Sequence, residues 1–295
     1  MAHVLKKDRV WVLAHPEKSI SNYQLTIINS LIKRRLEGEP LAYILGEQEV
    51  GGLKFKVNKN VLIPRPETED MVNLICHCEE AQQRRCGNPD ANTIKHEIAT
   101  LPRKASVARN DIIIDLGTGS GCLIISLVKK LNNKNIAFFA TDISAKALTV
   151  AKQNAKLNGV AGKIKFLHGN LLDPAIKNSV IKNCLKIKNF KLKIVCNLPY
   201  LKTGLKNLTK QQKLDLSFEP KIALMSGRDG LNHYRLLAKQ LKKLVKLYPD
   251  LNLEIFCEAD PDQMAGLKKI FADFQTEIKK DFRNKNRFLM AKNKK

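Results

Sequence analysis

A doubly wound α/β fold around a mostly parallel sheet is indicated by two features of residues 111–295. Short runs rich in β-branched residues alternate with helical stretches, a pattern typical of parallel strands joined by helical crossovers. The last two runs, QTEIKKDF and NRFLMAK, flank a short polar turn and predict an antiparallel pair at one edge of the sheet.

The elements expected between these ends follow in regular order. Helical stretches are identified by apolar residues at 3.6-residue spacing, and strands by short β-rich runs. The expected elements are strand 111–117, helix 119–131, strand 136–142, helix 144–159, strand 163–170, a helix near 174–185, strand 192–197, helix 230–248, strand 251–258 and helix 260–274.

The first 50 residues have a helical pattern and predict a small N-terminal domain. Apolar residues recur there at helical spacing, at Leu25, Ile28, Leu31 and Ile32. Ser21 is a candidate N-cap for this helix, and Gly38 with Pro40 marks its end.

A junction of about sixty residues is expected between the helical domain and the main one. The alternating run VGGLKFKVNKNVLI predicts a hairpin with Asn58–Asn60 at its turn, and a short helix is expected from about Glu67 to Glu80. Residues 80–110 are polar and aperiodic, which is typical of a long mobile connection. The predicted organisation is a helical domain (1–50), a junction (51–110) and a main domain (111–295).

Composition excludes some classes of protein. The chain has 295 residues, 44% of them hydrophobic, so a sizeable core is expected. No stretch approaches the ~18 consecutive apolar residues of a membrane span, and the N-terminus does not have the pattern of a signal peptide. Cysteines without framework spacing indicate a reducing, cytoplasmic setting, and we expect a monomer. The cysteines are Cys76, Cys78, Cys86, Cys122, Cys184, Cys196 and Cys257.

The net charge of +24 has two interpretations. One is that the protein works near nucleic acid, or on a partner that does. The other is a solvated basic surface, since the lysines are spread along the chain. Contact with nucleic acid is therefore possible but not required for the chemistry.

A cofactor site is predicted where the first strand of the main domain turns into its helix. Gly117, Gly119 and Gly121, with Thr118 and Ser120 between them, allow a tight turn and close approach to a ligand. Asp142 ends the next strand, where a carboxylate can accept hydrogen bonds from both ribose hydroxyls. The spacing differs from that of dinucleotide-binding turns, and a purely structural turn is the alternative. DLGTGSG resembles motif I of class I S-adenosylmethionine methyltransferases.

In that class, the residue that follows the third strand lies near the adenine of the cofactor. Asn170 occupies that position here, where many relatives have Asp. Its amide can still hydrogen-bond to adenine. The predicted cofactor-binding set is therefore Gly117, Thr118, Gly119, Ser120, Gly121, Asp142, Asn170 and Asn197.

An acceptor site is predicted at the end of the fourth strand. Asn197, Leu198, Pro199 and Tyr200 follow this strand directly, at the sheet edge where open α/β sheets bind ligands. The Asn197 side-chain oxygen and the Leu198 carbonyl can hold both N–H groups of an amide and turn its lone pair toward a methyl group. Tyr200 is expected to wall the pocket. A strand end followed by a proline turn is the structural alternative.

The cysteines and histidines between residues 76 and 96 raise the question of a zinc site. Cys76, His77 and Cys78 stand near Cys86 and His96. The C-x-C spacing lacks a second paired knuckle, so no metal is expected.

Taken with these motifs, the chain resembles the protein-(glutamine-N5) methyltransferases of the PrmC/HemK type. Two segments are the most specific, namely IPRPETE within residues 38–69 and SFEPKIALMSGRDGL at residues 217–231. The C-terminal KDFRNKNRFLMAK is also similar to the family's last strand pair.

The resemblance implies a fold and an activity. The fold would be a class I S-adenosylmethionine-dependent methyltransferase, Rossmann-like, with a mostly parallel seven-stranded sheet, an antiparallel C-terminal edge and a helical N-terminal domain. The activity would be methylation of the Gln amide in the Gly-Gly-Gln loop of peptide chain release factors. Arg65, Glu67, Glu219 and Pro220 would then bind substrate or brace the loops.

The sequence departs from the family pattern in three places. Leu198 stands where the family has Pro, the N-terminal domain is short, and residues 80–110 are longer than the usual connection. The acceptor role survives at Leu198 if that position contributes only its backbone carbonyl.

Two other functions stay open at this point. The Asn-Leu-Pro-Tyr spelling also occurs in rRNA adenine-N6 dimethyltransferases, and the basic charge suits them. Those enzymes lack IPRPETE and the loop at residues 217–231. A noncatalytic module that binds S-adenosylmethionine is the other alternative.

Overall fold

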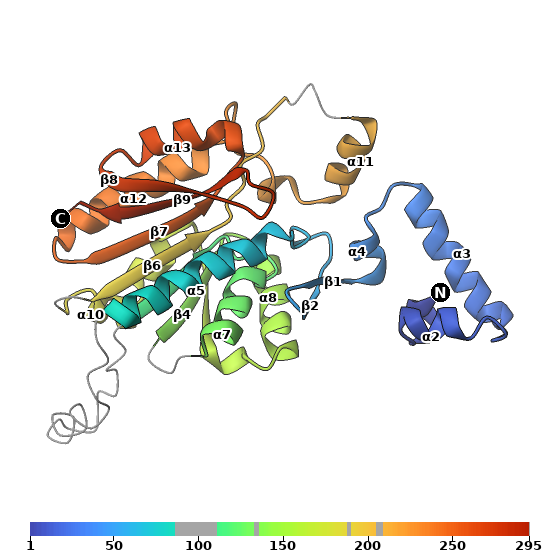
Figure 1. The fold of residues 1–295 in the computed structure, drawn as a ribbon. Coiled ribbons are helices and arrows are strands. Elements are labelled where there is room, and N and C mark those ends of the chain that lie inside the picture. Colours follow the sequence, from blue (N-terminus) through green and yellow to red (C-terminus); the bar gives the residue numbers. More distant parts are fainter. Residues whose placement is uncertain (86–110, 133–135, 188–189, 205–208, 295) are drawn as a thin grey trace, which may run out of the picture.

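A single twisted sheet organises most of the molecule (Figure 1). The computed structural model describes residues 1–85, 111–132, 136–187, 190–204 and 209–294. The sheet has seven strands in the order β5-β4-β3-β6-β7-β9-β8, and β1 and β2 form a separate hairpin. The strands are β1 (Glu47–Val50), β2 (Leu53–Lys56), β3 (Asp111–Leu116), β4 (Ile136–Asp142), β5 (Ile164–His168), β6 (Lys191–Cys196), β7 (Asn252–Glu258), β8 (Phe274–Lys280) and β9 (Asn286–Asn293).

Helices cover both faces of the sheet (Figure 1). The α-helices are α1 (Ala2–Leu5), α2 (Arg9–Ala14), α3 (Asn22–Leu36), α4 (Leu41–Leu45), α5 (Glu67–Arg85), α7 (Cys122–Leu131), α8 (Ala145–Leu157), α9 (Asp173–Lys177), α10 (Ser179–Cys184), α11 (Lys210–Phe218), α12 (Asn232–Leu247) and α13 (Met264–Ile270). The short 3₁₀ turns are η2 (Ala161–Lys163), η3 (Lys221–Ala223) and η4 (Pro261–Gln263).

Strand direction confirms the predicted doubly wound arrangement. Five neighbouring strands of the sheet, β5, β4, β3, β6 and β7, are parallel to one another. Strand β9 lies between β7 and β8 and is antiparallel to both. Leu116 of β3 pairs with Thr141 of β4 and Cys196 of β6, and Cys196 in turn pairs with Cys257 of β7. The carboxyl ends of these four strands therefore meet along one edge, where such sheets bind ligands.

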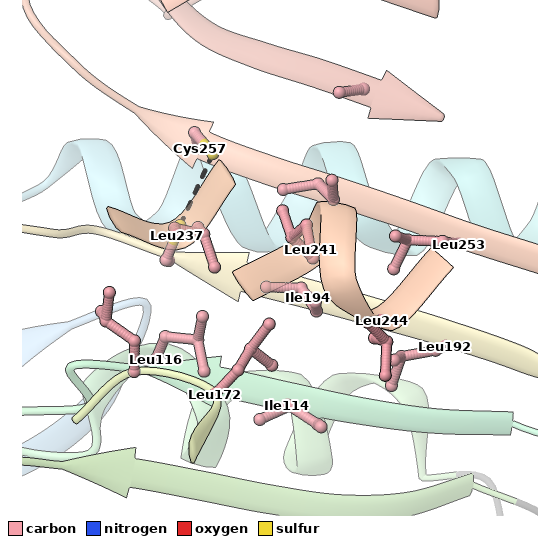
Figure 2. Close-up of a cluster of buried hydrophobic side chains, with 14 of the residues drawn as sticks. Ile114, Leu116, Leu172, Leu192, Ile194, Leu237, Leu241, Leu244, Leu253 and Cys257 are labelled. Atoms are coloured by element: carbon pink, nitrogen blue, oxygen red, sulfur yellow. Dashed lines mark hydrogen bonds between the residues drawn. The ribbon is translucent and has the colours of Figure 1, made fainter. Parts of the chain in front are cut away.

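Alternation along the strands builds two cores. On β3, Ile112 and Ile114 face one cluster, packed by α9, α10, α12 and α13, while Ile113 faces another, packed by α5 and α7. Figure 2 shows the first cluster, where Leu192 of β6 and Leu241 of α12 lie with Ile114. Because successive side chains point to opposite faces, a strand buried on both sides reads as a continuous apolar run.

A buried ion cluster interrupts the second core. Lys193 of β6 is fully buried, contacts Glu79 of α5, and its Nζ lies 3.0 Å from Glu254 Oε2 on β7. Lys292 Nζ lies 3.0 Å from the other Glu254 oxygen. Burial lowers the pKa of Lys193, and the pairing with Glu254 opposes that shift. The cluster joins α5 to the middle of the sheet.

The N-terminal helices lie to one side of the sheet (Figure 1). Ser21 caps α3 through a reciprocal capping box with Gln24, as its position predicted. None of the side chains in α1, α2 and α3 is fully buried. The next helix, α4, contributes Ala42 and Tyr43 to a small cluster that includes Val150 of α8, so it packs onto the main domain.

Two predicted elements are placed differently in the structure. The hairpin turns at Gly51 and Gly52, not at Asn58–Asn60, because both glycines adopt positive φ angles (57° and 73°) that a tight hairpin turn requires. The helix expected to end near Glu80 continues to Arg85. Most of the predicted mobile connection, residues 86–110, lies outside the described residues.

Candidate active site

A cavity of about 160 Å³ lies at the carboxyl edge of the sheet. It joins segments that are far apart in the sequence. Of the predicted site residues, its lining includes Arg65, Gly117, Thr118, Gly119, Ser120, Asp142, Asn170, Asn197, Leu198 and Pro199. Most of the predicted cofactor and acceptor residues therefore share one cavity, and Gly121 and Tyr200 are not among the described residues that line it.

The glycine turn is shaped for close approach. Gly117 and Gly119 have φ angles of 68° and 55°, in the left-handed region that favours glycine. A Cβ on Gly117 would lie 3.1 Å from the Leu198 side chain. Gly121 is different, because a Cβ there would lie 2.9 Å from Ile125 and 3.2 Å from Ala151, so this glycine permits close helix packing.

Asp142 is held by the turn that it faces. Its two carboxylate oxygens accept backbone N–H groups from Gly119 (2.9 Å) and Ser144 (2.8 Å). Each oxygen keeps a further lone pair for a ligand hydroxyl. Burial raises the pKa of Asp142, and the two N–H groups oppose that rise. The carboxylate therefore has a defined orientation at the mouth of the glycine turn.

Asp115, the second-to-last residue of β3, was not singled out from the sequence. It is buried, lines the cavity and accepts a hydrogen bond of 2.7 Å from the Thr118 hydroxyl. Burial raises its pKa to about 7, with Asp142 adding to the rise. Its signal in the sequence was the acidic residue inside an otherwise apolar strand.

The turn after β5 brings Asn170 to the cavity. The Thr141 hydroxyl donates to the Leu171 carbonyl (2.9 Å), and the Gly169 N–H donates to the Asp142 carbonyl (2.9 Å). These bonds tie the turn to the end of β4, so that Asn170 and Asp142 line the same space.

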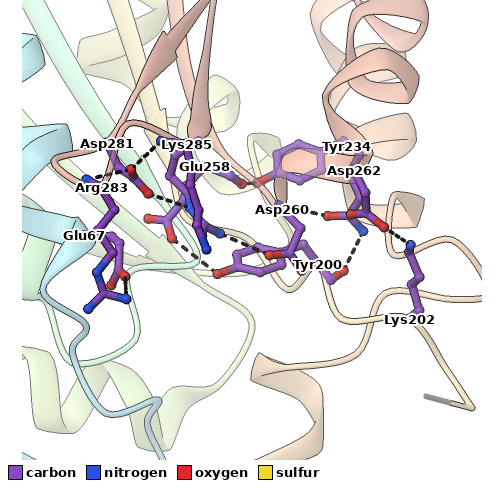
Figure 3. A network of polar contacts seen from close by, with 12 residues as sticks. Glu67, Tyr200, Lys202, Tyr234, Glu258, Asp260, Asp262, Asp281, Arg283 and Lys285 are labelled. Carbon is purple, nitrogen blue, oxygen red and sulfur yellow. Dashed lines mark hydrogen bonds and ion pairs between the residues drawn. The ribbon is translucent and has the colours of Figure 1, made fainter. Parts of the chain in front are cut away.

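The segment after β6 is divided between cavity and core. Asn197 and Pro199 line the cavity, whereas the Leu198 side chain is buried in the first core and also reaches the cavity wall. Tyr200 is not among the described residues that line the cavity. Its hydroxyl instead donates to Glu258 Oε1 at 3.3 Å (Figure 3).

The two family-like loops meet at one wall. Glu219 is buried, pairs with the Arg65 guanidinium and accepts the Ile63 N–H at 3.0 Å. Arg65, Ile222 and Ala223 line the cavity, whereas Glu219 and Pro220 are not among the described lining residues. The Ala223 N–H donates to the Pro220 carbonyl at 2.8 Å. Glu67 lies outside the lining and pairs with Arg283 at 3.9 Å.

His233 also lines the cavity and was not anticipated. Its ring Nδ1 lies 2.6 Å from the Ser226 hydroxyl, which also accepts the His233 backbone N–H at 3.1 Å. Burial lowers the pKa of His233, which favours the neutral ring. The sequence around His233 shows no motif or spacing that would have predicted its place in the cavity.

A metal centre finds no support in the described part of the chain, where no group of three or more His, Cys, Asp or Glu could hold an ion. Cys76 is buried in the second core, and His77 is exposed. Cys86 and His96 lie outside the described residues. No helix in the described ranges has the length and apolar character needed to cross a membrane.

Two families match parts of the chain. Residues 1–46 match the PrmC N-terminal domain, and residues 93–196 match ribosomal protein L11 methyltransferase (PrmA). The chain is 32% identical over 295 residues to the release factor glutamine methyltransferase of Bacillus anthracis, covering 99% of this chain and 89% of that protein. The chain belongs to the release factor glutamine methyltransferase family. The predicted family resemblance is thus confirmed.

Longer relatives of this family member are also known. The chain is 33% identical over 298 residues to the bifunctional methyltransferase of Rickettsia bellii, covering 98% of this chain and 49% of that protein. It therefore spans about half the length of these bifunctional relatives.

The fold of this chain is similar to that of a solved structure. The hMettl16 catalytic domain superposes with a TM-score of 0.50 at 16% identity, covering 82% of this chain and 76% of that chain. Together with the strand order, this confirms the predicted class I S-adenosylmethionine-dependent methyltransferase fold.

Proposed function

We propose that this chain transfers a methyl group from S-adenosylmethionine to the N5 side-chain amide of the Gln in the Gly-Gly-Gln motif of peptide chain release factors. The main observation behind this proposal is that Asn197 and Leu198 line the same cavity as the predicted cofactor residues Gly117, Gly119 and Asp142. Membership in the glutamine methyltransferase family supports the choice of acceptor.

The residues present fit the cofactor. The Gly117–Gly121 turn leaves room for the methionine end, the ordered Asp142 carboxylate suits the ribose hydroxyls, and the Asn170 amide suits adenine. When bound, S-adenosylmethionine supplies a methyl group activated by a positively charged sulfur.

The acceptor amide has to be oriented because its nitrogen lone pair is delocalised. The Asn197 side-chain oxygen and the Leu198 backbone carbonyl would accept its two N–H groups and turn the lone pair toward the methyl group. No general base is needed before transfer, since the nitrogen becomes strongly acidic once it carries the positive charge and then loses a proton.

Leu198 is compatible with this role despite replacing the family's Pro. Its side chain is 2% exposed and packs in the first core. That burial holds the backbone at this position, which in the family is stiffened by proline. A carbonyl contributed by the backbone is unaffected by the identity of the side chain.

The N-terminal helices supply a surface for the release factor. Large apolar side chains are exposed there, on helices α2 and α3, at Val10, Leu13, Tyr23, Leu25, Ile32 and Leu36. Large apolar side chains exposed on one small domain offer apolar area that a protein partner could bury. We propose that this surface contacts the release factor, and that the protein acts as a cytoplasmic monomer without requiring nucleic acid.

A labelled-methyl assay tests the proposal. Purified protein is offered unmodified release factor and unmodified small-subunit rRNA in parallel, and the product is mapped by mass spectrometry. Label on the Gly-Gly-Gln amide is expected. A release factor with Gln→Ala in that motif is the matched control and should take up none. Label on adenine, or cofactor binding without transfer to either, would overturn the proposal.

A further inference from the structure

Glu258 is a buried carboxyl group that neither the cofactor set nor the acceptor set uses. It is the last residue of β7, next to the strand that leads into Asn197, and is 2% exposed. Its Oε1 accepts the Tyr200 hydroxyl at 3.3 Å, and within the described part of the chain its Oε2 has no hydrogen-bond partner (Figure 3). A buried carboxyl oxygen without a partner costs folding free energy, and such groups concentrate at functional sites.

Tyr200 is the far end of the acceptor segment and is held at two points. Its hydroxyl reaches Glu258, and its carbonyl accepts the Gln263 side-chain N–H at 2.7 Å. Gly230 packs directly against that carbonyl, because a Cβ there would lie 2.0 Å from the oxygen. Tyr200 is three residues beyond Asn197, so its position limits where the Asn197 amide can lie.

Charged groups of both signs surround Glu258. Arg287 of β9 pairs with Asp260 at 3.1 Å and with Asp281 at 3.4 Å. Glu67 of α5 and Asp260 add negative charge, and the Tyr234 hydroxyl of α12 donates to the Glu258 backbone carbonyl. Burial raises the pKa of Glu258 to about 7, with Arg287 opposing the rise. The carboxyl group therefore changes charge in the physiological range.

We propose that Glu258 is a positioning residue for methyl transfer, which holds the Asn197–Tyr200 segment in register with the cavity through its hydrogen bond to Tyr200. This inference rests on the proposed function for its effect on turnover. Its structural part, the restraint of the segment by Glu258, is independent of the substrate. The bond should be stronger when Glu258 is ionised, because hydrogen bonds to a carboxylate are stronger than those to a neutral carboxyl group.

The test uses Glu258→Ala, Glu258→Gln, Tyr200→Phe and the double variant Glu258→Ala/Tyr200→Phe. Glu277→Ala is the matched control, since Glu277 is an exposed glutamate of the same sheet. Glu258→Ala and Tyr200→Phe should each lower kcat about tenfold, in line with the cost of small misplacements, without changing the Kd for S-adenosylmethionine. The double variant should be no slower than either single variant, because both remove the same bond.

Glu258→Gln should restore most of the lost turnover, because its amide oxygen still accepts the Tyr200 hydroxyl. The wild-type kcat should rise with pH around 7, and this step should be absent in Glu258→Gln and Tyr200→Phe. Fully additive effects in the double variant, or a pH step that persists in Glu258→Gln, would overturn the inference.

Hydrogen exchange separates this inference from the proposed function. Backbone amides of residues 197–203 should exchange faster in Glu258→Ala and Tyr200→Phe than in wild type and Glu277→Ala, without any substrate. If wild type methylates no release factor but exchange rises as expected, the proposed function fails and the restraint stands. If wild type is active and exchange is unchanged in both variants, the restraint fails.

Discussion

Asn197 and Asp142 come from strands that are separated by β3, yet they line one cavity. Each follows or ends a parallel strand, and the paired registers bring those strand ends to one edge. The two residues differ in what holds them. Asp142 is fixed by two backbone N–H groups, whereas Asn197 depends on the packing of Leu198 and the anchoring of Tyr200.

Replacing Asn197 by Ala should abolish most methyl transfer while S-adenosylmethionine still binds. The variant loses the side-chain oxygen that we propose orients the acceptor amide, and removal of one such group typically costs about 10²–10³ in kcat. Single-turnover transfer and cofactor titration measure the two effects separately. Asn183→Ala, an exposed amide on α10, is the control. Wild-type turnover in Asn197→Ala would contradict the acceptor role.

Helix α5 is joined to the sheet by charge as well as by apolar packing. Met71 and Ile75 of α5 are buried in the second core, and Glu79 of the same helix meets Lys193 of β6. Lys193, which is fully buried, lies between Glu79 and Glu254, and both glutamates are also buried. A buried cation between two carboxylates stabilises the arrangement only while all partners are present.

Lys193→Ala should therefore destabilise the protein strongly. It leaves two buried carboxylates without the cation between them, and breaking a buried pair costs about 3–5 kcal/mol. Urea unfolding followed by circular dichroism measures the change. Lys242→Ala, which removes an exposed lysine paired with Asp273, should cost less than about 1 kcal/mol. Equal losses in the two variants would show that the cluster does not stabilise the fold.

Over the whole molecule, the ligand-binding edge of the sheet carries groups that burial makes hard to ionise. Burial raises the pKa of Asp115 and of Glu258 to about 7 each, whereas the pKa of Glu254 is lowered to about 2 despite its burial, chiefly by Lys193 and Lys292. Groups with raised folded-state pKa values contribute their full stability below the unfolded-state pKa of about 4 and lose it as the pH rises toward the folded-state pKa of about 7. Glu254 acts oppositely, and its contribution is lost in acid.

From these groups, stability should accordingly be greatest near pH 4–5 and fall as the pH rises to about 7. Each pKa unit corresponds to about 1.4 kcal/mol, so Asp115 and Glu258 together are expected to contribute several kcal/mol to this fall. Urea unfolding of the cofactor-free protein at pH 5 and pH 7 measures it. The Asp115→Asn/Glu258→Gln double variant should lose much less stability over that range. An unchanged slope in the double variant would contradict the assignment.

Most of the fold was open to prediction because its signals are local. The strand runs, the helix cap at Ser21 and the glycine turn at Gly117–Gly121 depend on neighbouring residues only. The hairpin was misplaced because Asn58–Asn60 and Gly51–Gly52 are both turn formers, and the sequence did not show which turn the strand pairing uses. His233 and Glu258 carried no local signal, since their positions depend on which loops meet.

The order of residues alone determined the α/β pattern, the two strand ends that bear Asp142 and Asn197, and the family. Strand ends can be read from sequence because parallel strands must present their carboxyl ends to the same edge. Only the tertiary structure decided that Tyr200 points to Glu258 and that Lys193 joins α5 to the sheet. The direction of a side chain and its partner across the fold depend on three-dimensional packing, which spacing along the chain does not encode.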